Sequence, residues 1–369
     1  MTGSPPVRPR AGLRELSGYH SPQLDVTVRL NTNESPYPPP PAFVDAWLSA
    51  LRDVPLNRYP DRDAHALRSA LADHLGQPVE RVFCANGSNE VLQTLLLTYG
   101  GPERCAVTFE PTYALHSHIA RITGTEVVTG ERRADFTVDP DTATALLAAT
   151  HPTAVFACSP NNPTGTVEPA ETIQTLLGAT AGLVVVDEAY GEFADRSALE
   201  LVADDSSLRL VDDDGRLVVV RTYSKVWSMA ALRLGLCVAP PTVVDELEKV
   251  VLPYHLAVPT QLAGLLALRF GGEMEARVDL LVQERARLAE LLEPFDSLTV
   301  YPSGANFLLV RVDGDAGALW ERLVARGVLV RDFSAWPRLD GCLRVTVGTR
   351  DENDAFVAAL RGALEEVAA

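Results

Sequence analysis

The sequence feature that most constrains the fold is an alternation of short apolar runs with longer runs at helical spacing, from residue 81 to residue 239. Short apolar runs predict buried strands, and the longer runs between them predict helices. The predicted strands are 82–84, 105–109, 154–158, 183–186, 217–220 and 236–239, and the predicted helices are 89–98, 113–122 and 171–177. This order is typical of α/β proteins, in which helices cover both faces of a mostly parallel sheet.

Length and proline content divide the chain into three parts. With 369 residues the chain exceeds one typical domain, so a large domain and a smaller one are expected. Residues 1–41 are rich in proline and predict an extended N-terminal arm that lies on another part of the protein. Residues 42–258 hold the predicted sheet. Residues 259–369 predict a connecting helical segment and a small α+β domain, with elements at 259–292, 298–312, 316–325, 328–331, 342–347 and from 353 onward.

The charge balance argues against nucleic acid and membrane partners. The sequence has 32 basic and 49 acidic residues and a net charge of -17, which opposes binding to nucleic acid or to anionic membranes. It has neither the apolar core of a signal peptide nor a membrane-spanning apolar run of about 18 residues. Five widely spaced cysteines without a C-x-x-C motif are typical of reduced thiols. We therefore expect a cytoplasmic protein without a metal site.

Ligands of such sheets bind beyond the carboxyl ends of the strands, so the residues after each predicted strand are the functional candidates. After strand 82–84 a glycine turn leads into Ser88 and Asn89, which open a helix whose N-terminus suits a phosphate. Ordinary helix capping explains the same residues. After strand 105–109 comes Tyr113, whose ring can stack on a heteroaromatic cofactor; a buried core tyrosine is the alternative.

Two further strands end in polar motifs. The motif S-P-N-N-P-T-G at 159–165 has two X-Pro bonds and two amide side chains, and it predicts an unusual loop, with a cis proline as one option, that fixes Asn162. The motif V-V-V-D-E-A-Y at 184–190 puts Asp187 directly after an apolar strand. A carboxylate at that position needs a partner, which is either a cationic ring nitrogen or an arginine elsewhere in the protein.

Strand 217–220 leads into R-T-Y-S-K-V-W-S-M-A-A-L-R-L-G at 221–235, which contains Ser224, Lys225 and Arg233. A lysine amine forms Schiff bases with carbonyl compounds, and its pKa falls when it is desolvated or lies near a second cation. Ser224 and Arg233 are able to hold a phosphate. For this motif alone, a surface lysine at a strand-to-helix turn is the alternative.

Together these motifs fit one ligand, pyridoxal 5'-phosphate. It requires a Schiff-base lysine, a carboxylate beside its pyridine nitrogen, a hydrogen bond to its ring hydroxyl, a stacking ring and a phosphate cup. The candidates are, in that order, Lys225, Asp187, Asn162 with Tyr190, Tyr113, and the group Ser88, Asn89, Ser224 and Arg233. His116 and His118 lie two residues apart and point to different faces of a helix, so we expect them to be structural rather than metal ligands. Motifs typical of dinucleotide, P-loop nucleotide and serine-hydrolase sites do not occur.

The same motifs resemble those of the fold-type-I pyridoxal-phosphate aminotransferases (class I/II), and within them the histidinol-phosphate aminotransferase subfamily. N-P-T-G at 162–165, D-E-A-Y at 187–190, and S-K followed by L-R-L-G carry the resemblance to the superfamily. The resemblance to the subfamily spans nearly the whole chain and rests on G-Y-H, L-N-T-N-E-S-P-Y, R-Y-P-D, L-P-Y-H-L, G-V-L-V-R-D and C-L-R-V-T-V-G-T. Two positions depart from the family pattern, with Ser35 where asparagine is frequent and Ala231 where glycine is common.

The resemblance implies a role for each candidate. Lys225 would be the Schiff-base lysine and proton shuttle, and Asp187 the partner of the pyridinium nitrogen. Asn162 and Tyr190 would donate to the ring O3', and Tyr113 would stack on the ring. The cofactor phosphate would be bound by Ser88, Asn89, Ser224, Arg233 and, from the second subunit of a homodimer, Tyr59. The substrate side would be lined by Tyr19, Asn33, Tyr254, Arg331 and Arg344, with Arg344 on the substrate carboxylate or phosphate.

The resemblance implies transamination between L-histidinol phosphate and 2-oxoglutarate, which gives imidazole acetol phosphate and glutamate in histidine biosynthesis. An aromatic amino acid aminotransferase acting on phenylalanine or tyrosine is the main alternative, and a phosphothreonine decarboxylase is a more distant one. A non-enzymatic regulator that binds pyridoxal phosphate would carry a DNA-binding segment, and no helix-turn-helix candidate is found outside the two predicted domains. The expectation is a homodimeric enzyme with small-molecule substrates.

Overall fold

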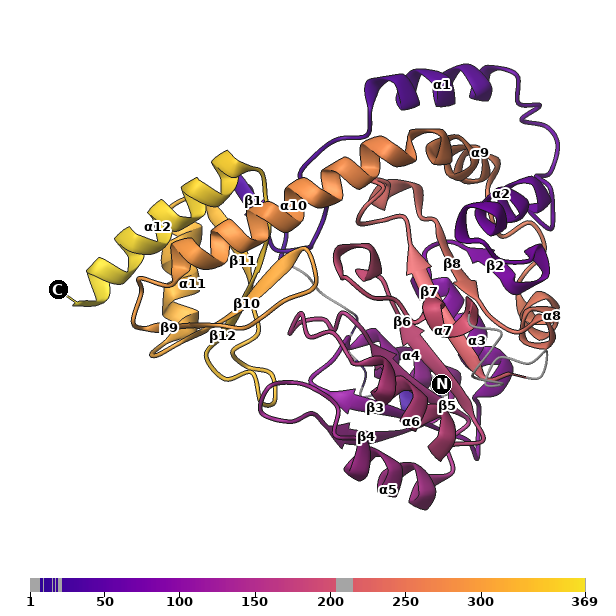
Figure 1. The fold of residues 1–369 in the computed structure, drawn as a ribbon, viewed down its shortest axis with the longest axis horizontal. Coiled ribbons are helices and arrows are strands. Elements are labelled where there is room, and N and C mark those ends of the chain that lie inside the picture. Colours follow the sequence, from indigo (N-terminus) through magenta and orange to yellow (C-terminus); the bar gives the residue numbers. More distant parts are fainter. Residues whose placement is uncertain are drawn as a thin grey trace, which may run out of the picture.

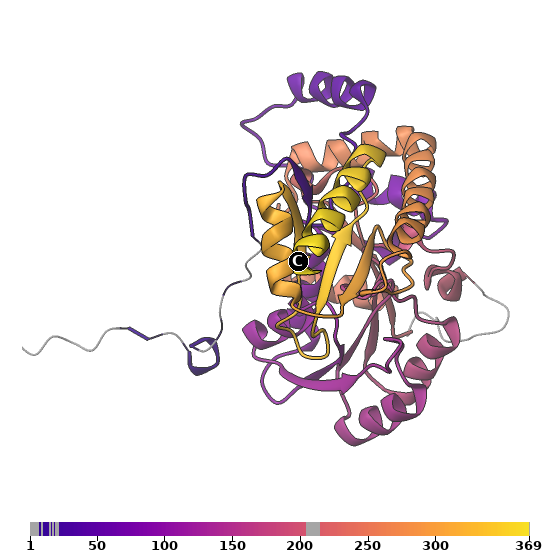
Figure 2. The same cartoon turned by 90° about the vertical axis from the view of Figure 1, so that its left-hand side faces the viewer.

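The computed structural model describes residues 7, 8, 10–14, 16, 18, 22–203 and 215–368. These residues form two sheets, each with its own helices. Figure 1 shows the larger sheet on the right and the smaller one on the left, with helix α10 (Gly271–Leu292) running along both. The view turned by 90° shows helix α1 (Pro41–Arg52) at the top edge (Figure 2), where Phe43 is buried and Trp47 donates a hydrogen bond to the carbonyl oxygen of Pro259. The α/β class predicted from the sequence is confirmed.

The larger sheet has seven strands, and all but one of them run in the same direction. Their spatial order is β2 (Val82–Ala85), β8 (Gly235–Val238), β7 (Leu217–Thr222), β6 (Leu183–Asp187), β5 (Ala154–Cys158), β3 (Cys105–Glu110) and β4 (Glu126–Glu131). The exception is β8, which pairs antiparallel with both β7 and β2. The carboxyl ends of β5, β6 and β7 therefore meet at one edge of the sheet.

Both faces of this sheet are buried, which explains the continuous apolar runs in the sequence. Along β6, Val184 and Val186 pack on one face while Val185 packs on the other. The first face meets helices α5 (Pro140–Thr150) and α6 (Ala170–Ala179), and the second meets α3 (Ser88–Tyr99), α4 (Leu115–Thr123) and α8 (Pro241–Val250). A carboxylate at the end of such a strand therefore lies in the protein interior, because the strand is buried on both faces.

The smaller sheet has five strands and takes its first strand from the N-terminal arm. Its spatial order is β1 (Val28–Leu30), β11 (Val328–Asp332), β12 (Cys342–Thr346), β10 (Phe307–Val312) and β9 (Leu298–Val300). Strand β1 pairs parallel with β11, with Val28 opposite Val328. Helices α11 (Ala316–Ala325) and α12 (Arg350–Ala368) and the end of α10 cover this sheet. The arm is thus tied down by backbone hydrogen bonds, and the predicted domain boundaries stay a prediction.

Two parts of the sequence pattern were interpreted too simply. Strand β4 and helix α5 were not predicted, because β4 is an edge strand whose polar, half-exposed residues break the apolar run. The segment 259–292 was predicted as one connecting helical stretch, but it forms α9 (Val258–Ala267), a short 3-10 turn and α10. Two glycines open α10, and glycine is a weak helix former, which is consistent with an interruption there. The remaining helices are α2 (His65–Leu75) and α7 (Leu199–Ala203).

Candidate active site

A cavity of about 320 Å³ lies where the carboxyl ends of the central strands face the smaller sheet. The last residues of β5, β6 and β7, which are Cys158, Asp187 and Thr222, all line it. Its volume is in the range of small-molecule sites. Eleven residues predicted from the sequence line this cavity: Asn33, Ser88, Asn89, Tyr113, Asn162, Asp187, Tyr190, Ser224, Lys225, Arg233 and Arg344.

Lys225 lies in the turn that follows β7 and presents its amine to the cavity. Its Nζ donates a hydrogen bond to the carbonyl oxygen of Thr32 at 3.0 Å, and it lies 5.8 Å from the centre of the Tyr190 ring. Burial lowers the pKa of Lys225 to about 7, and the nearby guanidinium groups of Arg344 and Arg233 act in the same direction. A neutral amine is therefore well populated at neutral pH, as a nucleophile or proton acceptor requires.

One end of the cavity is built as an anion site. Gly87 has a φ of 81° and precedes α3, whose first N–H groups have no partner within the helix. The guanidinium of Arg233 packs on this glycine so closely that a Cβ at Gly87 would lie 2.4 Å from its Nη2. Nη1 of Arg233 donates to Ser224 Oγ at 3.1 Å. A guanidinium, a serine hydroxyl and a helix N-terminus at one place suit a phosphate group.

Gly235, the glycine of the L-R-L-G motif, is required for a separate steric reason. A Cβ on Gly235 would lie 2.2 Å from the backbone nitrogen of Ser88. The first turn of α3 therefore approaches β8 only because position 235 has no side chain.

Asp187 holds its carboxylate inside the protein and is paired with a histidine. Oδ2 of Asp187 lies 2.9 Å from His116 Nε2, and Oδ1 accepts from the backbone N–H of Ala189 at 3.1 Å. The side chain of His116 is fully buried, and its Nδ1 has no hydrogen-bond partner among the described residues. The imidazole proton therefore belongs on Nε2, where the carboxylate accepts it.

His116 is the residue that sequence reasoning missed. We expected it to be a structural histidine, because a histidine two residues from another one carries no metal-site pattern. Its place one helical turn after Tyr113 was the available signal, and the two rings meet edge to face at 5.4 Å. Its ring also stacks on Phe156, with ring centres 4.9 Å apart.

The opposite wall of the cavity comes from the smaller sheet and the N-terminal arm. Arg344 on β12 donates from Nη1 to Asn162 Oδ1 at 2.6 Å and from Nη2 to the carbonyl oxygen of Asn31 at 2.7 Å. Asn33 Nδ2 donates to the Tyr190 hydroxyl at 2.9 Å. Burial raises the pKa of Tyr190 to about 12, so its hydroxyl keeps its proton and remains a donor.

The Asn162 loop has the backbone that its prolines suggested. The Ser159–Pro160 and Asn162–Pro163 peptide bonds are both cis. Next to it, Asn161 is fully buried and bonds to Thr112, Thr164 and the carbonyl of Pro111. This neighbour anchors the loop, so that Asn162 presents its amide to Arg344.

Three predicted residues within the described part of the chain do not line the cavity. Tyr59 and Tyr254 are 78% and 42% exposed and stack on each other, with ring centres 4.5 Å apart. Arg331 lies opposite Arg344 in the pairing of β11 with β12, but it does not line the cavity. Tyr19 lies outside the described residues. Tyr113 does line the cavity, and its hydroxyl donates to Asn89 Oδ1 at 3.2 Å.

The lowered pKa of Lys225 can be measured residue by residue, because the sequence contains only two lysines, Lys225 and Lys249. In cofactor-free protein, competitive labelling with acetic anhydride, read by mass spectrometry, should show Lys225 gaining reactivity with a midpoint near pH 7. Arg344→Gln should move this midpoint upward, because a positive charge that lowers the pKa is removed.

The exposed Lys249 is the internal reference for reagent decay in each sample. A Lys225 midpoint at the ordinary lysine value of about 10.4 would show that the amine is not desolvated.

Comparison with known proteins places the chain in a family. The family model of aminotransferase class I and II matches residues 25–360. The histidinol-phosphate aminotransferase of Frankia casuarinae is 46% identical over 363 residues, which cover 95% of this chain and 89% of that protein. The protein of the same name from Thermobifida fusca is 45% identical over 360 residues, or 95% of this chain and 94% of that protein.

Solved structures give the same result for the fold. The histidinol-phosphate aminotransferase of Sinorhizobium meliloti, solved in complex with pyridoxal-5'-phosphate, superposes with a TM-score of 0.87 over 99% of both chains at 24% identity. A putative histidinol-phosphate aminotransferase from Erwinia carotovora gives a TM-score of 0.84 at 25% identity, over 95% of this chain and 99% of that chain. The chain belongs to the class I and II aminotransferase family.

Proposed function

We propose that this chain is a pyridoxal-phosphate-dependent transaminase that exchanges an amino group between L-histidinol phosphate and 2-oxoglutarate, giving imidazole acetol phosphate and glutamate. The observation that carries the proposal is the 43–46% identity, over at least 95% of the chain, to relatives named histidinol-phosphate aminotransferase. The five cysteines are free thiols, and within the described residues no helix is long and apolar enough to cross a membrane. Both findings are compatible with the cytoplasmic location expected from the sequence.

The donor set of the cavity fits pyridoxal phosphate in its chemistry. Ser88, Asn89, Ser224 and Arg233, together with the α3 N-terminus, would hold the phosphate. The buried carboxylate of Asp187 suits a protonated ring nitrogen, because only a cation or a strong donor offsets its desolvation. Asn162 and Tyr190 would hold the ring hydroxyl, and Tyr113 offers a ring for stacking.

When bound, pyridoxal phosphate supplies an electron sink for the carbon that loses its proton. The Lys225 Nζ would take this proton and return it, which requires the neutral amine that the pKa of about 7 provides. Asp187 would keep the ring nitrogen protonated. His116 acts as a positioning residue, because its Nε2 fixes one oxygen of that carboxylate and leaves Oδ1 on the Ala189 N–H.

Arg344 would bind the acidic group of the substrate. Its guanidinium is buried between the Phe307 and Phe333 rings, with centroids 5.2 and 5.3 Å from Cζ. It donates hydrogen bonds to the neutral oxygens of Asn162 and Asn31, and a guanidinium has the planar set of donors that binds a carboxylate or a phosphate. The Arg331 guanidinium on the neighbouring strand adds positive charge, which favours a phosphate dianion over a carboxylate.

Steady-state kinetics with 2-oxoglutarate should give a higher kcat/KM for histidinol phosphate than for phenylalanine, tyrosine or phosphothreonine. Arg344→Ala should lower kcat/KM for histidinol phosphate. The loss of transition-state stabilisation should exceed the roughly 2 kcal/mol typical of one lost charged hydrogen bond, because the substrate anion loses a buried cationic partner. Arg322→Ala on α11, a half-buried arginine that does not line the cavity, is the matched control and should leave kcat/KM unchanged.

Higher kcat/KM for phenylalanine than for histidinol phosphate would assign the chain to the aromatic amino acid alternative. An equal loss for all four substrates on Arg344→Ala would show that Arg344 does not distinguish the phosphate of histidinol phosphate from a carboxylate, and no loss for any of them would remove its role in binding the substrate anion.

A homodimer with shared active sites belongs to the same proposal. Tyr59 lies outside the cavity of its own chain and is exposed together with Tyr254, Leu56 (87%) and Leu252 (75%). Four large apolar side chains exposed in this part of the chain suit a protein interface. In a two-fold dimer, Tyr59 would reach the phosphate end of the second subunit's cavity.

Mixing Tyr59→Ala and Lys225→Ala subunits should restore activity, because each mixed dimer has one site with both native residues. With random exchange, recovery on the order of a quarter of the wild-type activity is expected. Each variant alone is the control. Stable mixed dimers without any recovery would remove the shared-site proposal while leaving the reaction assignment intact.

A further inference from the structure

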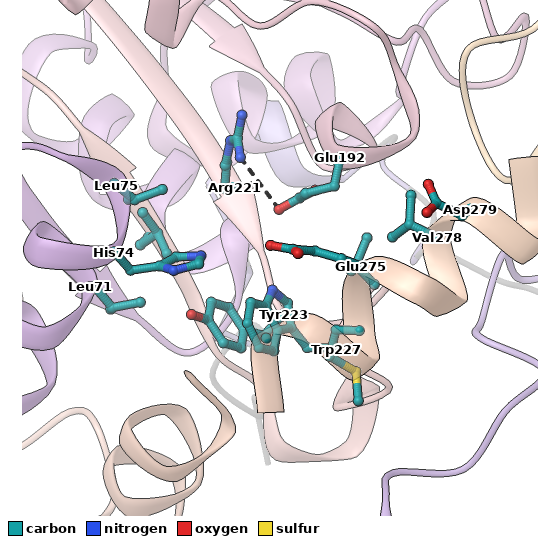
Figure 3. Close-up of a pocket in the computed structure, with 14 residues that line it drawn as sticks. Leu71, His74, Leu75, Glu192, Arg221, Tyr223, Trp227, Glu275, Val278 and Asp279 are labelled. Atoms are coloured by element: carbon teal, nitrogen blue, oxygen red, sulfur yellow. Dashed lines mark ion pairs between the residues drawn. The ribbon is translucent and has the colours of Figure 1, made fainter. Parts of the chain in front are cut away.

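A second cavity, of about 240 Å³, lies behind the candidate active site, between α2, strand β7 and the first turns of α10 (Figure 3). Its floor is apolar and buried, with Leu71, Leu236 and Met274 at 3% exposure or less. Tyr223 and Trp227 stack at 4.7 Å to form one wall. None of the residues given a role in transamination lines this cavity.

The two cavities are separated by a single layer of chain. At the end of β7 and in the turn that follows it, Thr222, Ser224 and Lys225 line the first cavity, whereas Tyr223, Val226 and Trp227 line the second. The segment after β6 is shared in the same way, since Tyr190 faces the first cavity and Glu192 the second. A ligand that moves Trp227 therefore acts on the backbone that holds Lys225, two residues away.

The charges of the second cavity favour a cation. Arg221 is the one lysine or arginine among the described residues that line it, and it pairs with Glu188 at 2.9 Å and with Glu192 at 3.6 Å. Two more carboxylates, Glu275 and Asp279, come from α10 and lie at the exposed rim. Acidic groups thus outnumber the single guanidinium, which is already engaged.

The groups around Glu192 also favour a cationic ligand. Burial raises the pKa of Glu192, and its Oε2 has no hydrogen-bond partner among the described residues. Burial lowers the pKa of His74, so the imidazole adds no full positive charge at neutral pH. Figure 3 shows the Glu192 and Glu275 side chains both pointing into the cavity, opposite the His74 ring. A cation bound between these carboxylates would be attracted by both of them.

We propose that this cavity is a second ligand site, which binds a small organic cation with an apolar or aromatic body and is coupled to Lys225 through the 222–227 turn. The carboxylates of Glu192 and Glu275 bind the charged group, and the wall of Tyr223 and Trp227 packs against the ligand body. The two sites are coupled because a ligand that binds more tightly to one conformation of this turn increases the population of that conformation. The binding site does not depend on which amino donor the enzyme uses.

Benzyltrimethylammonium is a suitable probe, because a quaternary nitrogen cannot condense with the cofactor. Calorimetric titration of the holoenzyme should show one saturable site per chain, and benzyl alcohol, the neutral probe, should bind more weakly. Glu275→Gln should weaken binding of the cation at least about threefold, the effect of one partly exposed charge. Glu290→Gln, an exposed change farther along the same helix, should leave binding unaltered.

Coupling is measured as the change in kcat/KM that saturating probe causes with the best amino donor. Wild type and Glu290→Gln should respond to the same extent, and Glu275→Gln should respond only at a correspondingly higher probe concentration. Absence of saturable binding would overturn the proposed site. Binding that is insensitive to Glu275→Gln would also overturn it, because the probe would then be bound elsewhere, as at the active site. Binding without any change in kcat/KM would overturn the coupling.

Discussion

The chemistry of the site depends on the free-energy cost of a charged amine at Lys225, where the fold buries that amine near two other cations. Strand β7 is held between β6 and β8, and its end delivers Lys225 to a cavity that already contains the guanidinium groups of Arg233 and Arg344. Desolvation and like charges both favour the neutral amine, and together they bring its pKa to about 7. The guanidinium groups of Arg233 and Arg344 attract an anionic ligand whether or not the amine is charged. Binding of anions and activation of the lysine therefore have one electrostatic origin.

The N-terminal arm is what joins the two halves of this site. Its three residues after β1 each bond to a different residue of the cavity: Asn31 to Arg344, Thr32 to Lys225 and Asn33 to Tyr190. Asn33 also exchanges hydrogen bonds with Thr346 on β12 of the smaller sheet. Because β1 is itself a strand of that sheet, a shift of the smaller sheet is carried directly to these contacts. Asn33 bonds to Tyr190 and also lines the cavity, so its place on the substrate side, which the family resemblance implies, stays a prediction.

Sequence reasoning succeeded where local chemistry and strand order decide the outcome. The rule that ligands bind beyond the carboxyl ends of parallel strands was enough to gather Asn162, Asp187 and Lys225 in one cavity. It missed His116, because the value of that residue comes from its contact with Asp187, 71 positions away. It missed β4 because the residues of an edge strand are partly exposed. The proposed role of Tyr59 depends on a second subunit, whose position a single chain does not fix.

Covalent attachment of pyridoxal phosphate is the most direct test of the central claim, and the presence of two lysines makes it unambiguous. The purified protein should be yellow after incubation with pyridoxal phosphate, and borohydride reduction should fix the cofactor on the peptide that contains Lys225. Lys249, exposed on α8, should remain unmodified at equimolar cofactor. Lys225→Ala should be colourless. A protein that stays colourless with pyridoxal phosphate, or that carries the reduced cofactor on Lys249 alone, would contradict the account.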